Sequence, residues 1–505
     1  MTLLIFALAI APSSNRKIDV AKAIKADMIP LSSIQPSAKL DDLKPIGKFL
    51  KDVQVVGIGE ATHGTSEFCT MKHRMFRYLV EEQGFTVFGL EASMPDCIAM
   101  DDYVMNGKGD PKAAVKAQGF WTWSTQELLD LITWMRAYNQ DSKHTKKLRV
   151  FGYDMQSQVG TTRYFERKEK ELTGTPDVHF WEMVSWNPLD QELRQKTRVK
   201  MDGLIKLMGA KLGEDEAKQA KFVEEVFFQS EKINWLQHLA NRQFHALPKM
   251  AENFKDAGIL LVDLKLTEGE AYEGLKFLDE HKGKQIDIPV EDRLKVSRKL
   301  EQQLAALGKL LPGKEKVLED RISEQCRLLS FLAFGMTSPD FEGSPTTSFF
   351  FRDQCMARNI ERGLKELYPD QKMMVWAHNG HIMRMEGSVG KTMGGNLDQS
   401  MGKKYYPIGF SFSSGRFNAF GPIEDQFTHE VPQAKAGSLD DTFLKSGIPL
   451  FFLPLHGEYG TQTTRQIGAY FDLKKENEFY MELPPSRAYS ALIFIAKTTP
   501  THLLK

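Results

Sequence analysis

VVGIGE (residues 55–60) is the first of four short apolar runs that decide the fold of this chain. The other three runs are FGLE (88–91), RVFGYD (149–154) and MMVWAH (373–378). Each run is rich in Val, Phe or Met and too short for a buried helix, which is typical of a parallel strand in an α/β sheet. We therefore expect an α/β fold with a mostly parallel central sheet flanked by helices.

Each run ends on an ionisable residue, and these residues are Glu60, Glu91, Asp154 and His378. In parallel sheets, ligands bind outside the carboxyl ends of the strands. Three carboxylates and one imidazole should therefore face a common pocket. Such a pocket is typical of an enzyme.

The composition narrows the class of protein. The chain has 505 residues, of which 42% are hydrophobic and 26% charged, as in ordinary soluble globular proteins. Lys and Arg total 66, as do Asp and Glu, and this balance predicts no nucleic-acid partner. The 4 cysteines form no C-x-x-C pair, so we expect buried free thiols instead of a zinc ribbon or a disulfide scaffold.

Residues 1–50 form a lead-in to the first strand. Within residues 1–14, the run LLIFALAI followed by Ala-Pro-Ser-Ser resembles the apolar core and cleavage region of a secretory signal, although no Lys or Arg precedes it. The run is too short to span a bilayer and no other segment approaches that length, so no stable membrane insertion is expected. A cytoplasmic and an exported location both remain open.

The segments 51–163 and 340–505 carry the α/β pattern and are predicted to form the catalytic domain. Residues 67–82 place apolar side chains on one face, which predicts an amphipathic helix that Gly84 ends. The later runs PIGFSF, PLFFLPL and YSALIFIA are expected as further strands. Residues 164–339 are dense in charge and helical in period, so we expect a large helical insertion, or lid subdomain.

The turn at residues 59–64 places Glu60 and His63 between glycines. Glycine permits unusual dihedral angles and the close approach of a ligand, and a histidine can take up a proton near neutral pH. Glu60 would orient the His63 ring and stabilise its protonated form. Both residues could instead only cap the turn, but charged residues are rarely buried unless they are paired or functional.

Glu91 and Asp154 are predicted to complete the same site. Glu91 could instead cap a helix or form a salt bridge with Lys72 or Arg74 on the preceding helix, and Asp154 has a similar structural alternative. A salt bridge would not exclude a role in catalysis, because a paired carboxylate in a cleft also has a tuned pKa.

His378 and His381 lie in WAHNGHI, where Asn-Gly marks a tight turn at a strand end. In one interpretation, His378 works with His63 and the carboxylates in acid–base catalysis, and His381 contacts the substrate. In the other, His63, Glu67, His378 and His381 bind a metal such as zinc. No dedicated metal signature such as H-E-x-x-H is present, so we predict a site with no metal and no other cofactor.

Five further residues are candidates for substrate binding or have structural alternatives. Arg352 could hold a polar or anionic substrate group, or could cap its helix. Lys72 and Arg74 lie on the first helix, where neighbouring positions diverge and cannot all face the pocket. Trp121 and Trp123 could line a pocket for a large apolar ligand, or could belong to the core.

The nucleophile is expected to be water. The chain has no G-x-S-x-G elbow and no Cys-His pattern, and therefore no support for an acyl-enzyme. It also lacks a P-loop and a complete dinucleotide-binding fingerprint. The nucleophile that remains is a water molecule activated by a His-carboxylate pair.

Seven stretches, taken in order, resemble the erythromycin esterase family. They are GEATHGTSEF, MKHRMFRYLVEEQGFTVFGLEA, WSTQELLDLITWMRAYN, GYDMQ, FFRDQCMARNI, WAHNGHI and GGNLDQSMGKKYYPIGFSFSSGRFNAF. The resemblance covers roughly residues 53–496, interrupted by the charged helical segment. Several motifs in the right order are far more specific than any one of them.

The resemblance implies a metal-independent hydrolase that opens the macrolactone ester of macrolide antibiotics, a reaction that confers antibiotic resistance. Four residues match the essential positions of the family: Glu60, His63, Glu91 and His378. The base would be His63 or His378, while His381 and Arg352 match other motif positions.

One departure from the family concerns Lys72. Members that degrade macrolides carry an arginine at this place in the first helix. Lysine keeps the charge but loses the bidentate fork, so the substrate range is open.

Two other functions stay open on the sequence. A metal-dependent hydrolase of another ester or of a peptide would use the same residues as ligands. A haem-binding protein without enzymatic activity would use His63 or His378 as an axial ligand, although carboxylates buried beside an apolar ligand would be costly. The expected partner is a small-molecule ester, and the sequence does not indicate an oligomeric state.

Overall fold

The computed structural model describes residues 24–186, 191–231, 233, 348–387, 390–423, 426–457 and 459–504. The chain divides into two compact units, the first of residues 1–230, 352–387 and 391–505, and the second of residues 231–351 and 388–390. Nearly all of the second unit lies outside the described residues. The signal segment predicted at 1–14 also lies outside them, and the predicted bounds of the helical insertion, 164 and 339, stay a prediction.

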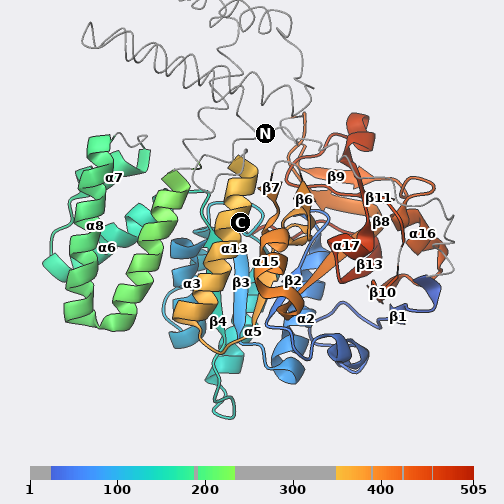
Figure 1. Ribbon diagram of the computed structural model, residues 1–505, viewed down its shortest axis with the longest axis horizontal. Coiled ribbons are helices and arrows are strands. Elements are labelled where there is room, and N and C mark those ends of the chain that lie inside the picture. Colours follow the sequence, from blue (N-terminus) through green and yellow to red (C-terminus); the bar gives the residue numbers. More distant parts are fainter. Residues whose placement is uncertain are drawn as a thin grey trace, which may run out of the picture. The chain divides into compact units, whose positions relative to one another are not determined.

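A mostly parallel sheet forms the centre of the first unit (Figure 1). Its strands follow the order β1-β10-β13-β8-β2-β5-β3-β4, and β9 pairs with β8. Their bounds are β1 Ile29–Pro30, β10 Leu450–Pro454, β13 Ala491–Thr498, β8 Tyr405–Asn418, β2 Val55–Ile58, β5 Met373–Trp376, β3 Val87–Ser93, β4 Arg149–Asp154 and β9 Thr428–Val431. Neighbours from β13 to β4 are parallel, whereas β1, β9 and β10 pair antiparallel. The predicted fold class and all seven predicted strands are confirmed.

The central strands end level with one another. Ile58 of β2 and Leu90 of β3 both lie opposite Trp376 of β5, and Leu90 also lies opposite Gly152 of β4. The residues that follow these positions therefore emerge at one edge of the sheet, as the parallel arrangement requires.

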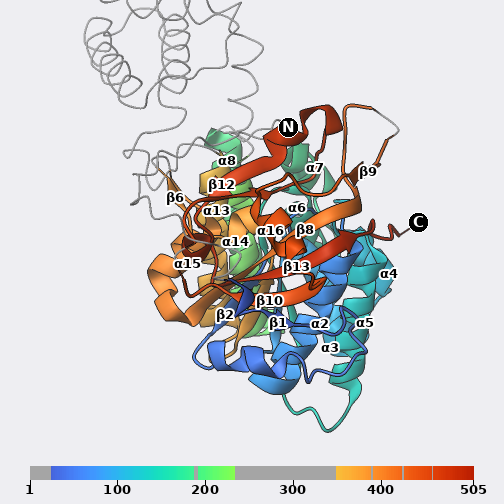
Figure 2. The ribbon, with the colours of Figure 1, turned by 90° about the vertical axis from the view of Figure 1, so that its right-hand side faces the viewer.

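Helices cover both faces of this sheet (Figures 1 and 2). One face carries α2 (Ser66–Gln83), α3 (Met94–Asn106), α4 (Pro111–Lys116) and α5 (Gln126–Gln140), and the other carries α13 (Ser348–Arg362), α14 (Asn379–Ile382) and α15 (Met393–Met401). The chain after β4 forms α6 (Val159–Thr173), α7 (Val178–Trp186), α8 (Gln191–Leu212) and a helical run at 214–231. Two further short helices are α16 (Leu439–Lys445) and α17 (Pro485–Ala488). Two short strand pairs lie outside the central sheet: β6 (Glu386–Gly387) with β7 (Gly390–Lys391), and β11 (Gln462–Arg465) with β12 (Tyr480–Leu483).

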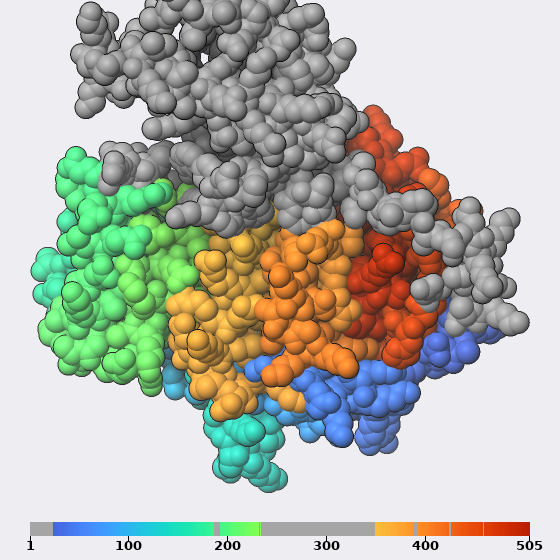
Figure 3. Space-filling model, in the orientation of Figure 1, coloured from blue at the N-terminus to red at the C-terminus, as the bar shows by residue number. Residues whose placement is uncertain are grey.

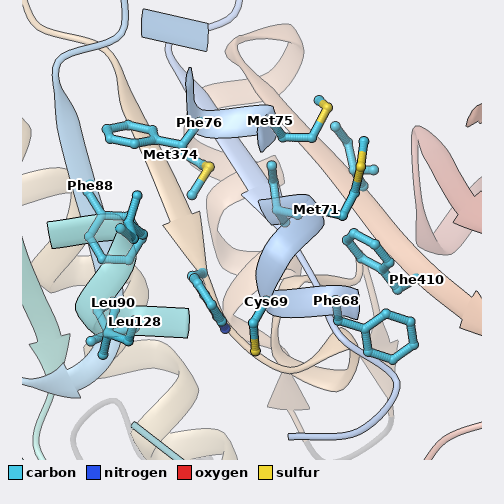
Figure 4. Close-up of a cluster of buried hydrophobic side chains, with 14 of the residues drawn as sticks. Phe68, Cys69, Met71, Met75, Phe76, Phe88, Leu90, Leu128, Met374 and Phe410 are labelled. Atoms are coloured by element: carbon cyan, nitrogen blue, oxygen red, sulfur yellow. The ribbon is translucent and has the colours of Figure 1, made fainter. Parts of the chain in front are cut away.

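Helix α2 forms where the sequence predicts an amphipathic helix, although its polar residues Lys72, His73 and Arg74 are buried as well. Gly84 ends it with a φ of 74°, in the left-handed region that glycine adopts without strain. Its apolar side meets the sheet in a dense aromatic and methionine core (Figure 4). Phe68 lies 5.0 Å from Phe410 of β8, and Phe76 lies 5.6 Å from Phe88 of β3, measured between ring centroids.

On the opposite face, α13 and α15 lie side by side (Figure 3). The hydroxyl of Ser400 on α15 donates to Glu361 on α13, which joins the two helices at their exposed sides. Met356 and Ile360 of α13 are fully buried beneath them.

Three of the cysteines, Cys69, Cys97 and Cys355, are buried as predicted, and Cys326 lies outside the described residues. Among the helices that the structure describes, none is both long enough and apolar enough to cross a membrane.

The structure contradicts the prediction that Arg74 binds the substrate. Its guanidinium donates to the carboxylate of Asp42 and to the backbone carbonyls of Ser33 and Lys39, and the side chain has no exposed surface. Arg74 therefore anchors the segment before β2 onto α2. The physical reason is that positions 72 and 74 point in different directions on one helix.

We expect Arg74→Ala to lower the free energy of unfolding by about 3 kcal/mol, because Asp42 and two carbonyls would lose a buried partner. Urea unfolding measures this change. The turnover of any substrate should stay unchanged. Lys44→Ala, which removes the solvent-exposed ion pair with Asp41, is the control and should not change stability measurably. If Arg74→Ala instead lowered turnover without lowering stability, Arg74 would have a role in the site after all.

Candidate active site

Four predicted site residues meet at one edge of the sheet. Glu60 and His378 each follow the end of a strand by two residues, Glu91 lies near the end of β3, and Asp154 is the last residue of β4. Because these strands are neighbours and parallel, their side chains form two connected groups of charges.

The first group is a chain of three residues in which Glu60 is central. One carboxylate oxygen of Glu60 lies 2.6 Å from Nδ1 of His63, and the other accepts a hydrogen bond of 2.5 Å from Nζ of Lys72. Glu60 is 1% exposed and Lys72 is 0% exposed. Burial alone would raise the pKa of Glu60, but Lys72 and His63 outweigh burial and hold this pKa below its usual value. Glu60 is therefore a carboxylate.

Trp376, at the end of β5, supports this chain and was not among the predicted site residues. The indole N–H of Trp376 donates at 2.9 Å to the Glu60 oxygen that also accepts from Lys72. Nζ of Lys72 lies 4.2 Å from the centroid of the Trp376 ring. The signal was present in the sequence, because Trp376 and His378 are two residues apart and side chains at i and i+2 of a strand share a face.

Two glycines allow this turn to form, for a reason other than the predicted approach of a ligand. A Cβ on Gly64 would lie 2.0 Å from the backbone oxygen of Asn418, and a Cβ on Gly59 would lie 2.1 Å from the Asn379 side chain. At both positions a side chain would clash with a neighbouring segment, so glycine is what lets the turn at residues 59–64 pack closely against Asn379 and Asn418.

The second group is centred on Arg352 of α13. Its guanidinium donates to both oxygens of Asp154 at 2.8 Å and to Glu91 at 2.5 Å. Burial alone would lower the pKa of Arg352, but Asp154 and Glu91 outweigh burial and raise it. Burial likewise would raise the pKa of Glu91, but His381 and Arg352 hold this pKa well below its usual value. Arg352 and Glu91 are therefore both charged at neutral pH.

His381 joins the second group through Asp353. Nδ1 of His381 lies 2.6 Å from the buried carboxylate of Asp353, and Nε2 lies 3.0 Å from the Arg352 guanidinium and 3.3 Å from Glu91. Burial alone would lower the pKa of His381, but Asp353 and Glu91 outweigh it and raise this pKa. Asp353 is thus a supporting residue of the site, because its carboxylate holds the His381 ring.

His378 lies between the two groups. Its backbone N–H donates to Glu91 at 2.9 Å, and its ring centroid lies 5.1 Å from that of His63. The ring itself is held at both nitrogens, because Nδ1 accepts from the Gly380 N–H at 3.1 Å and Nε2 lies 3.1 Å from the carbonyl of Ile467. Burial, together with His63, lowers the pKa of His378 to about 3, so the ring is neutral at neutral pH.

The remaining predicted residues take different places. Lys72 is enclosed beneath Glu60, so it cannot contact a substrate directly as predicted, and it acts on the site through Glu60. Trp123 is 4% exposed, and its ring centroid lies 6.3 Å from that of His63. Trp121 packs against Phe420 and Phe427, with centroid distances of 5.9 and 4.8 Å.

One of the residues that the metal interpretation requires, Glu67, is otherwise engaged. Glu67 accepts hydrogen bonds from the backbone and the hydroxyl of Thr499. Within the described ranges, no three His, Cys, Asp or Glu side chains are placed to hold one metal ion.

The Glu91 cluster predicts how stability depends on pH. The folded-state pKa of Glu91 lies below its unfolded value of about 4.3, so its stabilising contribution is complete above that pH and is lost progressively as the pH falls toward the folded-state pKa. The free energy of unfolding of the wild type should therefore fall from pH 6 to pH 3 more steeply than that of Glu91→Gln.

Urea unfolding at a series of pH values between these limits measures this difference. Glu91→Gln should be less stable than the wild type by about 3 kcal/mol at the upper limit, because Arg352 loses one buried partner, and the gap should narrow at the lower limit. Glu192→Gln, at an exposed ion pair with Lys196, is the control and should retain the wild-type slope. Parallel curves for the wild type and Glu91→Gln would contradict the assignment.

Comparison with known proteins adds a family and a fold. The erythromycin esterase family model matches residues 80–259 and 264–498. The Bacillus subtilis (strain 168) protein named "Putative hydrolase YbfO" is 23% identical over 496 residues, which cover 94% of this chain and 90% of that protein. Erythromycin esterase type II of Escherichia coli is 28% identical over 138 residues, or 27% of this chain and 32% of that enzyme.

Two crystal structures share the fold. A Bacillus cereus protein aligns with a TM-score of 0.57 and 23% identity, covering 96% of this chain and 98% of its own. A succinoglycan biosynthesis protein aligns with a TM-score of 0.57 and 21% identity, covering 98% of this chain and 100% of its own. Because both sequence identities are low, these two structures support the fold and not a function.

Proposed function

The chain belongs to the erythromycin esterase family, and on this premise we propose that it hydrolyses a carboxylic ester with a water molecule activated by His63. Family membership supports a hydrolase, and the more specific proposal rests on the geometry of the site. The substrate that we propose first is the macrolactone of a macrolide antibiotic.

The hydrogen bond between Glu60 and His63 carries the proposal. A carboxylate 2.6 Å from Nδ1 holds the proton on that nitrogen, so Nε2 is left as the basic nitrogen. When Nε2 takes a proton from water, the resulting imidazolium is stabilised by the same carboxylate. A negatively charged Glu60 is essential for this, and Lys72 and Trp376 keep it so.

His63 is a better base than His378 in this arrangement. The His63 side chain is 14% exposed, and its one hydrogen bond to a described residue is through Nδ1. His378, in contrast, uses both ring nitrogens to hold the turn. We therefore assign general-base catalysis to His63 and the positioning of the turn at residues 376–382 to His378.

The second group of charges supports the other half of the reaction. Attack of hydroxide on the ester carbonyl places negative charge on the carbonyl oxygen, and a fixed cation nearby stabilises this oxyanion. Arg352 is 11% exposed at its side chain and remains charged, and His381 has a raised pKa. We assign oxyanion stabilisation to this pair. Collapse of the intermediate then releases the alkoxide, which takes its proton from the His63 imidazolium.

The choice of a macrolide rests on the family and on aromatic surface near His63. Trp123 lies near the His63 ring, and two residues earlier Trp121 meets Phe427 edge to face beside Phe420, which is 55% exposed. Aromatic surface of this kind suits a large apolar ligand. It supports a macrolide without distinguishing it from other bulky esters.

Incubation with a 14-membered macrolide tests the reaction. We expect mass spectrometry to show a product heavier by one water, and we expect His63→Ala to lower turnover by about 10³-fold, the range of a general base. The variant should remain folded, with a free energy of unfolding lower by about 1–3 kcal/mol, because one oxygen of the buried Glu60 loses its partner. Dialysis against a chelator should leave turnover unchanged.

The other outcomes are equally informative. If the wild type gives no water adduct, a panel of bulky esters should replace the macrolide. A folded His63→Ala variant with wild-type turnover would remove His63 from the mechanism.

Chemical rescue separates the two histidines. Added imidazole should restore part of the turnover of His63→Ala, because the missing group is a base. It should not restore His378→Ala, because there the missing group is a pair of hydrogen bonds to Gly380 and Ile467. Turnover measured against imidazole concentration distinguishes the two roles, with His73→Ala as the control at a buried histidine on α2. If imidazole rescued His378→Ala and not His63→Ala, His378 would be the base and His63 the positioning residue.

A further inference from the structure

Residues 499–504, which follow β13, run across the first turns of α2 and α5. This segment, which we call the strap, pairs with both turns in isolated antiparallel bridges. Thr65 is bridged to Pro500, and Thr125 is bridged to Leu503. One extended segment thus holds two helix starts that are far apart in sequence.

The first contact of the strap is with the turn that carries His63. The Thr501 N–H donates to the carbonyl of Gly64 at 3.0 Å, and the Ser66 N–H donates to the carbonyl of Thr499 at 2.9 Å. These bonds satisfy backbone groups on either side of Thr65, next to the proposed base. A short loop with such partners has less freedom to move than one that is hydrated.

The second contact is with the turn that carries Trp123, which lies against the His63 ring. The Gln126 N–H donates to the carbonyl of His502 at 2.7 Å, and the Leu504 N–H donates to the carbonyl of Ser124 at 2.9 Å. The strap therefore fixes both the turn of the base and the turn of its aromatic neighbour.

Two carboxylates fasten the strap. Glu67 accepts from the backbone and from the hydroxyl of Thr499, each at 2.7 Å. Glu127, which is 8% exposed, accepts from the Ser66 hydroxyl at 2.6 Å and lies 2.9 Å from Nδ1 of His502. Glu127, in the first turn of α5, therefore joins the two helix starts to the strap.

We propose that the strap is a positioning element that sets the place of His63 relative to Glu60 and the bound ester. Small displacements of a catalytic group, of about 1 Å, can cost about 100-fold in rate. The kinetic part of this inference rests on the proposed function, while the mechanical part does not.

The test is the full-length double variant Glu67→Gln/Glu127→Gln, which keeps the shape of both side chains and removes their charge. Hydrogen exchange read by mass spectrometry should show faster exchange in peptides that cover residues 61–66. Turnover of the hydrolysed ester should fall about tenfold, with KM changed by no more than about twofold. If the double variant does not fold, each single variant is measured in its place.

Arg74→Ala is the matched control. It releases the segment before β2 from the same helix α2, without touching the turn that carries His63. At comparable loss of stability, it should leave both turnover and exchange at residues 61–66 unchanged. If hydrogen exchange at residues 61–66 were unchanged in the double variant, the inference that the strap restrains this turn would be wrong. Faster exchange with wild-type turnover would overturn its role in positioning.

A wild type that hydrolyses no ester would contradict the proposed function and leave the strap testable. In that case, the NMR signal of the His63 Nδ1 proton, which the hydrogen bond to Glu60 protects from solvent, replaces turnover. Displacement of His63 from Glu60 should broaden or abolish this signal in the double variant, while Arg74→Ala should retain it. Identical signals in all three proteins would overturn the positioning role.

Discussion

The buried ion pair between Glu60 and Lys72 is the constraint on which the rest of the site depends. Two opposite charges with 1% and 0% exposure are stable in the interior only if each has a fixed partner. Lys72 must therefore point from α2 directly under the end of β2. This fixes the rotation of α2, and the same rotation turns Phe68 and Phe76 into the aromatic core.

This constraint also explains why the site contains two groups of charges and not one. Glu60 with Lys72, and Glu91 with Arg352, each bring a carboxylate and a cation together, so neither carboxylate is left to take up a proton. His63 is then the group in the first cluster that can change its charge during a reaction. His378 separates the clusters, touching His63 with its ring and Glu91 with its backbone.

The sequence predicts the sheet well, and it also predicts that the charged residues at the strand ends meet, because both follow from local features. A short apolar run that ends in a charged residue identifies a strand end, and parallel pairing brings Glu60, Glu91 and Asp154 to one edge. The partners of these residues were not predictable in this way. Arg352 reaches Asp154 from a helix 198 residues away in sequence, and Arg74 is paired with Asp42 instead of a substrate. Periodicity gives the face of a helix, but it does not give the neighbour that this face meets.

The lysine at position 72 illustrates how such a neighbour changes the meaning of a residue. From the sequence, lysine in place of the family's arginine raised a question about substrate recognition. In the structure, Lys72 contacts one oxygen of Glu60 and the face of Trp376, and the second oxygen of Glu60 is left for His63. A guanidinium with its bidentate fork would compete with His63 for that oxygen unless it approached end-on, whereas an ammonium is a point charge that needs only one. The substitution therefore bears first on how Glu60 is shared between its cation and the proposed base, and only through this on the proposed ester substrate.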